Sequence, residues 1–174
     1  MDVRCMNKKR HLFLTGEKGI GKSTLLKKLL EGRGERIGGF VTVRSTQVFP
    51  GKTSLHMLRP EGGEVPAEEN FLCFCPPRGD AAAAERFDRL GCAALARDGE
   101  LIMMDELGPA EARAEAFREM IQAMLEGSVP ILGVLQKGDS PLYRMIAAHP
   151  NVCLVEVTAE NRDALAEIWK NKKA

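Results

Sequence analysis

Apolar residues along the chain follow two different periodicities. Short apolar runs predict strands near residues 11–15, 101–104, 129–135 and 152–157. Apolar residues at helical spacing predict helices over 22–30, around 87–94, over 111–125 with a stop at Gly127, and after residues 140 and 161. The run at 101–104 shows no alternation, which is typical of a strand buried on both faces of a parallel sheet. Strands that alternate with helices predict an α/β fold with a mainly parallel sheet flanked by helices.

A second pattern breaks this alternation after the first helix. Residues 38–44 and 53–59 are rich in strand formers, and the turn residues at 49–52 lie between them. Two such runs joined by a turn predict an added β-hairpin. Residues 71–75 predict a further short strand.

Polar residues mark where the predicted helices begin. Asp80 precedes the helix that carries Phe87, and Asn161 precedes the last helix. Both are residue types that cap helices through their side chains, and Ser140 followed by Pro141 is a favoured start of the same kind.

The glycine-rich segment between the first strand and the first helix matches the P-loop pattern G-x-x-x-x-G-K-[ST] in full. Glycines let successive N–H groups point at one anion, Lys22 reaches the β- and γ-phosphates, and Ser23 offers a hydroxyl to Mg²⁺. We expect a run of consecutive residues to bind the nucleotide: Gly16, Glu17, Lys18, Gly19, Ile20, Gly21, Lys22, Ser23 and Thr24.

Two acids end the buried strand at 101–104. In P-loop folds an acid at such a strand end holds Mg²⁺, so Asp105 and Ser23 are the predicted metal ligands. Glu106 is the candidate general base that takes a proton from the attacking water. The competing interpretation is that both carboxylates simply end a strand in solvent.

Composition limits the other classes of protein. A length of 174 residues fits a single domain over 1–174. The formal net charge of +1 argues against a dedicated nucleic-acid or membrane-surface binder. No apolar run approaches the length of about 18 residues that a membrane span needs, and residues 1–10 lack the apolar segment of an export signal.

The five cysteines are an odd number in a chain whose core is large enough to need no disulfide. We therefore expect free thiols in a reducing cytoplasm. Cys73 and Cys75 are spaced to share one face of a strand. Core packing is the favoured interpretation for this pair, and metal or redox chemistry is the alternative, since no Cys or His cluster supplies further ligands.

The chain resembles the small P-loop nucleoside-triphosphatases known as the cancer-related or thermophilic NTPase family. The resemblance rests on four segments: the P-loop over 16–24, Gly39-Phe40 with Arg44, Asp105-Glu106-Leu107-Gly108 with Glu111, and Val157-Thr158-Ala159-Glu160-Asn161-Arg162-Asp163. It implies a RecA-like P-loop core and Mg²⁺-dependent hydrolysis of ATP, GTP and other nucleoside triphosphates to diphosphates.

This sequence departs from the family at three places. Glu17-Lys18 stands where the family has small residues or proline, and a Val-Gly-x-Tyr segment is absent before Phe87. Gln136-Lys137-Gly138 replaces a polar, histidine-containing stretch after the strand ending at Leu135. By position, Gln136 is the candidate sensor of the γ-phosphate.

Two arginines are further candidates. Arg44 ends the first strand of the hairpin, where it either stabilises charge on the transferred phosphoryl group as an internal arginine finger or is a solvated surface residue. Arg162 lies in the first turn of the last helix, where a cation opposes the helix dipole. It either stacks on the nucleotide base or pairs with Glu160 or Asp163.

Two other functions remain open at this stage. A nucleotide or small-molecule kinase shares the P-loop but requires an acceptor pocket. A nucleotide-dependent switch would control a protein or RNA partner, although an aromatic content of 5% disfavours recognition of RNA by base stacking.

Overall fold

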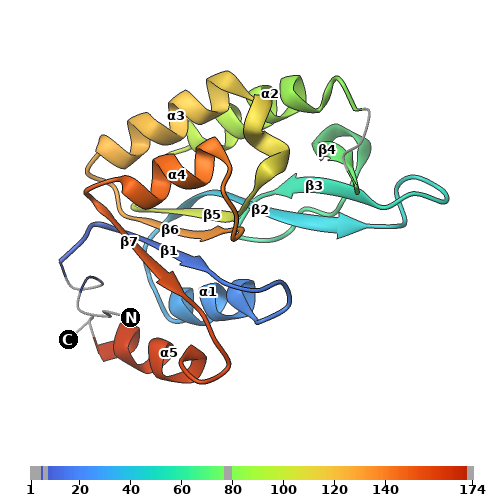
Figure 1. Cartoon of the computed structure of the whole chain (residues 1–174). Coiled ribbons are helices and arrows are strands. Elements are labelled where there is room, and N and C mark those ends of the chain that lie inside the picture. The colour runs from blue at the N-terminus through green and yellow to red at the C-terminus, as the bar shows by residue number, and fades with distance from the viewer. Residues whose placement is uncertain (1–4, 6–7, 77–79, 172–174) are drawn as a thin grey trace.

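The computed structural model describes residues 5, 8–76 and 80–171 of the chain (Figure 1). The terminal residues 1–4 and 6–7, which belong to the segment expected to lack an export signal, lie outside these ranges. In chain order the elements are β1 (His11–Thr15), α1 (Lys22–Leu30), β2 (Ile37–Ser45), β3 (Ser54–Leu58), the 3-10 turn η2 (Glu68–Asn70), β4 (Phe71–Phe74), α2 (Ala83–Leu95), β5 (Leu101–Leu107), the 3-10 turn η3 (Pro109–Arg113), α3 (Glu115–Glu126), β6 (Ile131–Leu135), α4 (Pro141–Ala148), β7 (Val152–Glu156) and α5 (Arg162–Asn171).

The described strands form one seven-stranded sheet in the order β4-β3-β2-β5-β6-β1-β7. The neighbouring pairs from β2 to β7 are all parallel, so the strands that carry the P-loop and the acidic pair end at the same edge of the sheet. β6 lies between β1 and β5. This sheet, flanked by helices on both faces, confirms the predicted P-loop α/β fold class.

The predicted hairpin is confirmed as β2 and β3, which pair antiparallel from Val41↔Leu58 to Ser45↔Ser54. β4 then pairs antiparallel with β3 and forms the sheet edge. In Figure 1 the hairpin extends beyond the helical layers. The far half of β2 therefore projects past the edge where the parallel strands end.

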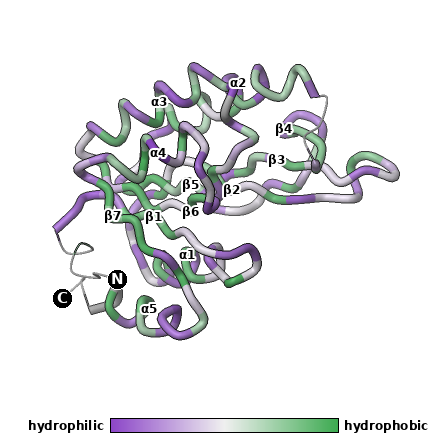
Figure 2. The backbone as a smooth tube through the Cα atoms, in the orientation of Figure 1, coloured by the Kyte–Doolittle hydropathy of each residue, from purple (hydrophilic) through white to green (hydrophobic). Residues whose placement is uncertain are grey.

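Two apolar clusters occupy the two faces of the sheet. On β1, Phe13 joins the cluster under α2, α3 and α4, whereas Leu12 and Leu14 join the cluster against α1 and α5. Successive side chains of a strand point to opposite faces, so an uninterrupted apolar run serves both clusters. Figure 2 shows this as hydrophobic colour along β1 and β7. Each such buried side chain contributes about 1.5–3 kcal/mol relative to exposure.

The helix predicted over 111–125 begins later than expected. Residues 109–113 form a 3-10 turn, and Ala114, with ψ of 90°, separates it from α3. Glu111 turns inward in this segment, where its carboxyl oxygen accepts the N–H of Gly108 at 2.9 Å. Periodicity alone does not reveal that inward turn.

The predicted caps have mixed outcomes. Ser140 is confirmed as the cap of α4, because its hydroxyl accepts the N–H of Tyr143 at 3.1 Å. Asp80 is wrong as a side-chain cap, since Ala82 occupies the N-cap of α2. The Asp80 carboxylate instead receives the Arg86 guanidinium at 2.5 and 2.6 Å, and an ion pair at this distance satisfies it more strongly than a helix N–H.

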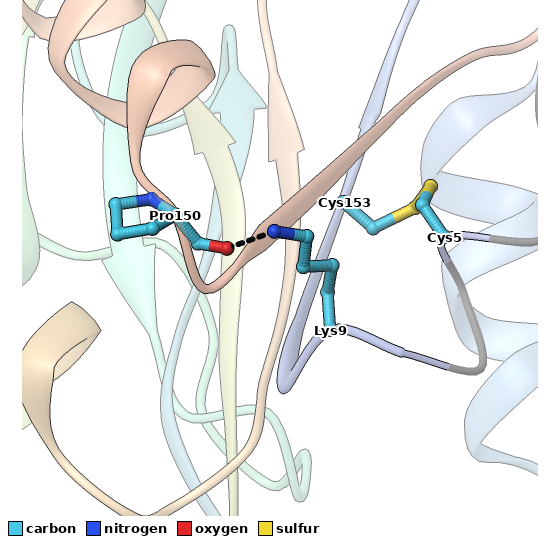
Figure 3. The surroundings of a disulfide bond; sticks show 4 residues. All are labelled: Cys5, Lys9, Pro150 and Cys153. Carbon is cyan, nitrogen blue, oxygen red and sulfur yellow. Dashed lines mark hydrogen bonds between the residues drawn. A yellow bond between two sulfur atoms is a disulfide. The ribbon is translucent and has the colours of Figure 1, made fainter.

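The expectation that all cysteines remain free is wrong for one pair. The structure joins Cys5 to Cys153 of β7 in a disulfide across 148 residues (Figure 3). Beside it, the Lys9 ammonium donates to the carbonyl oxygen of Pro150. The sheet brings the segment before β1 next to β7, and spacing along the chain contains no sign of that proximity.

None of the described helices is both long enough and apolar enough to cross a membrane.

Candidate active site

The loop between β1 and α1 has the conformation that its glycines allow. Gly21 occupies the N-cap of α1 with φ of 99°, and no side chain caps this helix end. Gly16 has φ of 136°, and a Cβ there would lie 2.6 Å from the carbonyl oxygen of Val157. The first N–H groups of α1 therefore remain available for an anion, and the neighbouring chain approaches the loop too closely for any side chain at Gly16.

Lys22 curls back over this loop. Its ammonium donates to the carbonyl oxygens of Gly16 and Glu17, each at 3.0 Å, and the residue is only 7% exposed. Two hydrogen bonds thus hold one positive charge above the loop. This is where the phosphates of a bound nucleotide would meet it.

Ser23 and Asp105 meet across the loop. The Ser23 hydroxyl donates to the Asp105 carboxylate at 2.9 Å. Burial raises the pKa of Asp105 to about 6, with the charge of Glu106 raising it further and the Ser23 hydrogen bond, Lys27 and Lys22 lowering it. A divalent cation between these two oxygens would favour the ionised carboxylate.

The two oxygens fit Mg²⁺, which prefers hard oxygen ligands and keeps several waters and phosphate oxygens. Within the described ranges, no group of three or more His, Cys, Asp or Glu residues is placed to hold a metal. The protein would therefore supply only part of the coordination, and a bound nucleotide would supply much of the rest.

Glu106 is half-buried at the carboxyl end of β5, and its N–H donates to the Thr42 hydroxyl of β2 at 3.1 Å. It lines a cavity of about 690 Å³ together with Lys18, Arg44 and Gln136. Four of the predicted site residues, from the P-loop, β2, β5 and the segment after β6, therefore converge on one hollow.

A backbone hydrogen bond positions Gln136 beside this cavity. Its N–H donates to the carbonyl oxygen of Leu107 at 2.7 Å, and its side-chain oxygen lies 2.6 Å from where a Cβ on Gly108 would stand. Any residue larger than glycine at 108 would displace this amide.

Arg162 lies on the other side of the P-loop. It lines a separate cavity of about 240 Å³ with Gly21 and Thr24, and its side chain lies alongside Gly21. Its guanidinium pairs with Asp163 at 3.5 Å. The predicted alternative of a salt bridge is thus present, at a position that also borders the nucleotide loop.

Glu17, which departs from the family pattern, faces Lys137. The Lys137 ammonium lies 3.3 Å from the Glu17 carboxylate and 2.7 Å from that of Glu156. The hydrogen bond with Glu156, followed by that with Glu17, raises the pKa of Lys137. The two departures from the family pattern, an acid at position 17 and a base at position 137, therefore carry opposite charges that pair with each other.

Sequence reasoning assigned no role to Thr42 and none to Glu111 beyond its place in the family motif. Glu111 is 2% exposed and lines the larger cavity. Burial raises its pKa to about 8, against the lowering effect of its own N–H and that of Gly108. For Thr42 the sequence did contain a signal. Thr42 and Arg44 are two residues apart in a predicted strand, so their side chains lie on one face of β2.

Replacing Glu111 with Gln is expected to remove a pH dependence from the free energy of unfolding. The native carboxyl, with its pKa raised from 4.5 to about 8, binds a proton that the unfolded chain has lost. The free energy of unfolding of the parent should therefore fall as pH rises, by about 1.4 kcal/mol per pH unit between about pH 6 and 8. Urea unfolding across this range measures both slopes, and equal slopes in parent and variant would contradict the assignment.

Cys73 and Cys75 both line the larger cavity and both are free. Burial raises the pKa of Cys73 to about 12, so its thiol stays protonated, as the core-packing interpretation requires. Cys75 is half-buried.

Comparison with known proteins gives a consistent result. A family model described as NTPase matches residues 11–169. The nucleoside-triphosphatase THEP1 of Aquifex aeolicus (strain VF5) is 30% identical over 169 residues, which cover 90% of this chain and 94% of that protein. The protein of the same name from Methanocaldococcus jannaschii is 27% identical over 175 residues, which cover 92% and 95%. The crystal structure of THEP1 from Aquifex aeolicus superposes with a TM-score of 0.66 at 26% identity, covering 91% of this chain and 95% of that one.

Proposed function

The chain belongs to the NTPase family, and from that premise we propose that it is a Mg²⁺-dependent nucleoside-triphosphatase that hydrolyses ATP and GTP to the diphosphate and phosphate. The observation that carries the proposal is the meeting of Lys22, the Ser23–Asp105 pair and Glu106 at one edge of the sheet. Phosphate release from ATP and from GTP by the purified chain, with and without Mg²⁺, tests it.

Residues of the P-loop bind the triphosphate in this proposal. The N–H groups around Gly21 and the ammonium of Lys22 meet the phosphates, and Arg162 borders the space on the far side of the loop for the nucleoside. Mg²⁺ at Ser23 and Asp105 would neutralise charge on the phosphates.

Glu106 takes the proton of the attacking water in this proposal. The N–H of Glu106 donates to the Thr42 hydroxyl, which holds the backbone at this position, and Glu106 lines the larger cavity. Arg44 lines the same cavity and would stabilise charge on the transferred phosphoryl group, and Gln136 would contact its oxygens.

Replacing Asp105 with Asn is expected to raise the Mg²⁺ concentration needed for half-maximal activity by at least about tenfold, because a carboxylate ligand is lost from a cation that prefers charged oxygens. Binding of ATP without metal should be nearly unchanged, which serves as the internal control. A Mg²⁺ titration of phosphate release measures the effect, and an unchanged titration would remove Asp105 from the metal site.

We infer a cytoplasmic location from the nucleoside-triphosphate substrate.

A further inference from the structure

The larger cavity extends away from the nucleotide loop. Of the residues predicted to bind the nucleotide on the P-loop, only Lys18 lines it, whereas Gly21 and Thr24 border the smaller cavity on the Arg162 side. A nucleotide lying across the loop would therefore place its γ-phosphate in the part of the larger cavity near Lys18, and would leave the part lined by Leu55, Cys73 and Cys75 unoccupied.

The hairpin and β4 supply part of the lining of this cavity. Arg44, Leu55 and Cys73 lie side by side in register across β2, β3 and β4, and all three line the cavity. Glu106, Glu111 and Gln136 line the same cavity from β5, from η3 and from the segment after β6. Cross-strand pairing fixes these three positions relative to one another, with a register shift between β3 and β4 directly after Leu55.

The size of the cavity exceeds what hydrolysis needs. A water molecule takes up about 30 Å³ of liquid, and the cavity measures about 690 Å³. That volume lies within the range of about 300–1,000 Å³ typical of sites for small organic molecules. The cavity is therefore large enough for a second substrate beside the γ-phosphate.

The lining indicates the chemistry of that substrate. Lys18 and Arg44 are both exposed to solvent, and their side chains form no hydrogen bond or ion pair with any other described residue, so two unpaired cations are among the residues that line the cavity. Glu111, whose pKa is raised, adds little negative charge at neutral pH, which leaves Glu106 as the main anion. No aromatic side chain lines the cavity among the residues that the structure describes, so nothing there favours a flat ring.

We propose that this cavity binds a small hydroxylated organic anion as a second substrate, and that the protein transfers the γ-phosphoryl group of the nucleotide to its hydroxyl. The proposal rests on the nucleotide site proposed above. The acceptor oxygen forms a bond to the γ-phosphorus, the bond from that phosphorus to the β,γ-bridging oxygen breaks, and the diphosphate leaves. Glu106 takes the hydroxyl proton and releases it to solvent. Hydrolysis is the same reaction with water when the cavity holds no acceptor.

The three strands also explain why Arg44 would meet the acceptor's negative charge. Lys18 belongs to the loop that would hold the phosphates. The Arg44 guanidinium carries five N–H donors, so it can contact both the transferred phosphoryl group, as proposed above, and the anionic group of the acceptor beside it. Arg44 stands on the hairpin, two residues beyond Thr42, which is about 7 Å along the strand. An anion held by Arg44 would leave its hydroxyl free to face Glu106.

Cys75 provides a direct test of anion preference inside the cavity. Its alkylation by iodoacetate, an organic anion, is compared with alkylation by the neutral iodoacetamide, and Cys92 on α2 serves as the internal reference. We expect the iodoacetate-to-iodoacetamide rate ratio to be at least about fivefold higher at Cys75 than at Cys92, and to fall to the reference in Arg44→Ala. Equal ratios at the two cysteines in the parent would overturn the anion site.

Phosphoryl transfer is tested with glycerate as the anionic probe and glycerol as its neutral counterpart. With labelled ATP and millimolar glycerate, we expect phosphoglycerate to form at least about tenfold faster than glycerol phosphate forms from the same concentration of glycerol. Because transfer to glycerate yields ADP without free phosphate, formation of ADP should exceed release of free phosphate. If ADP and free phosphate still form in equal amounts in the presence of glycerate, the acceptor role is overturned while the NTPase proposal stands. If neither product forms, the NTPase proposal itself fails.

A cavity-filling variant separates the two activities. Leu55→Trp is expected to abolish transfer to glycerate while phosphate release stays within about twofold of the parent, which also shows that the variant is folded. Leu55→Phe is the smaller version, and Lys52→Trp, on the same hairpin but outside the cavity lining, is the matched control. Transfer by Leu55→Trp at the parental rate would overturn the proposed site.

Discussion

Replacing Glu106 with Gln should slow ATP hydrolysis by about 10²- to 10⁴-fold, which is the usual contribution of a general base. Gln keeps the size of the side chain and one hydrogen-bonding oxygen but cannot take a proton at neutral pH. The N–H of residue 106 still donates to Thr42, so the backbone should not move. The rate falls because the proton of the attacking water has no acceptor in the transition state.

The affinity of Glu106→Gln for ATP with Mg²⁺ should stay close to that of the parent, because a general base acts on the transition state and adds little to ground-state binding. Equilibrium binding and single-turnover phosphate release, measured on the same preparation, give both quantities. Glu85→Gln, an exposed acid on α2, is the control for loss of a charge alone. Hydrolysis within a factor of about three of the parent would assign the base to another residue and leave the nucleotide site intact.

Replacing Lys22 with Ala is expected to reduce turnover at least about 100-fold and to weaken triphosphate binding by about 1.5–3 kcal/mol, the value of a hydrogen bond to a charged group. The ammonium already sits above the loop, held by two carbonyl oxygens, so no rearrangement is needed for it to meet a phosphate. Its removal takes the nearest buried positive charge away from the phosphates.

The fold of Lys22→Ala should survive, because Lys22 bonds only within its own loop and the α1 core residues are leucines. Isothermal titration with a non-hydrolysable ATP analogue and thermal unfolding measure binding and stability separately. Lys52→Ala, an exposed lysine on the hairpin, is the matched control. Parental rates of hydrolysis in Lys22→Ala would show that the P-loop assignment is wrong.

Arg44 and Arg162 show what a local sequence pattern can predict and what it cannot. Sequence placed Arg44 at a strand end and Arg162 in a first helical turn, and it left two alternatives open for each. The structure leaves Arg44 exposed, as the surface alternative expected, and also among the residues that line the larger cavity, with no side-chain partner among the described residues; it pairs Arg162 with Asp163 beside Gly21. The contacts of a long side chain depend on the elements that pack beside it in space. Spacing along the sequence does not predict those elements.

The sequence by itself determined the elements and the chemistry within single elements. The uninterrupted apolar run of β1 and the glycines after it are local properties, since strand burial on two faces and positive φ angles depend on side-chain type at each position. The P-loop, the hairpin turn and the two acids near the end of β5 could therefore be predicted without any knowledge of packing.

Only the tertiary structure decided which residues distant in the sequence contact one another. The Ser23–Asp105 hydrogen bond, the inward turn of Glu111 and the Cys5–Cys153 pairing each join residues whose approach depends on strand order or on the path of a loop. The large cavity belongs to the same group, because part of its lining requires the register Arg44↔Leu55↔Cys73 across three strands. Register and strand order follow from how two apolar faces are covered by helices at once, which is a property of the whole chain and of no segment within it.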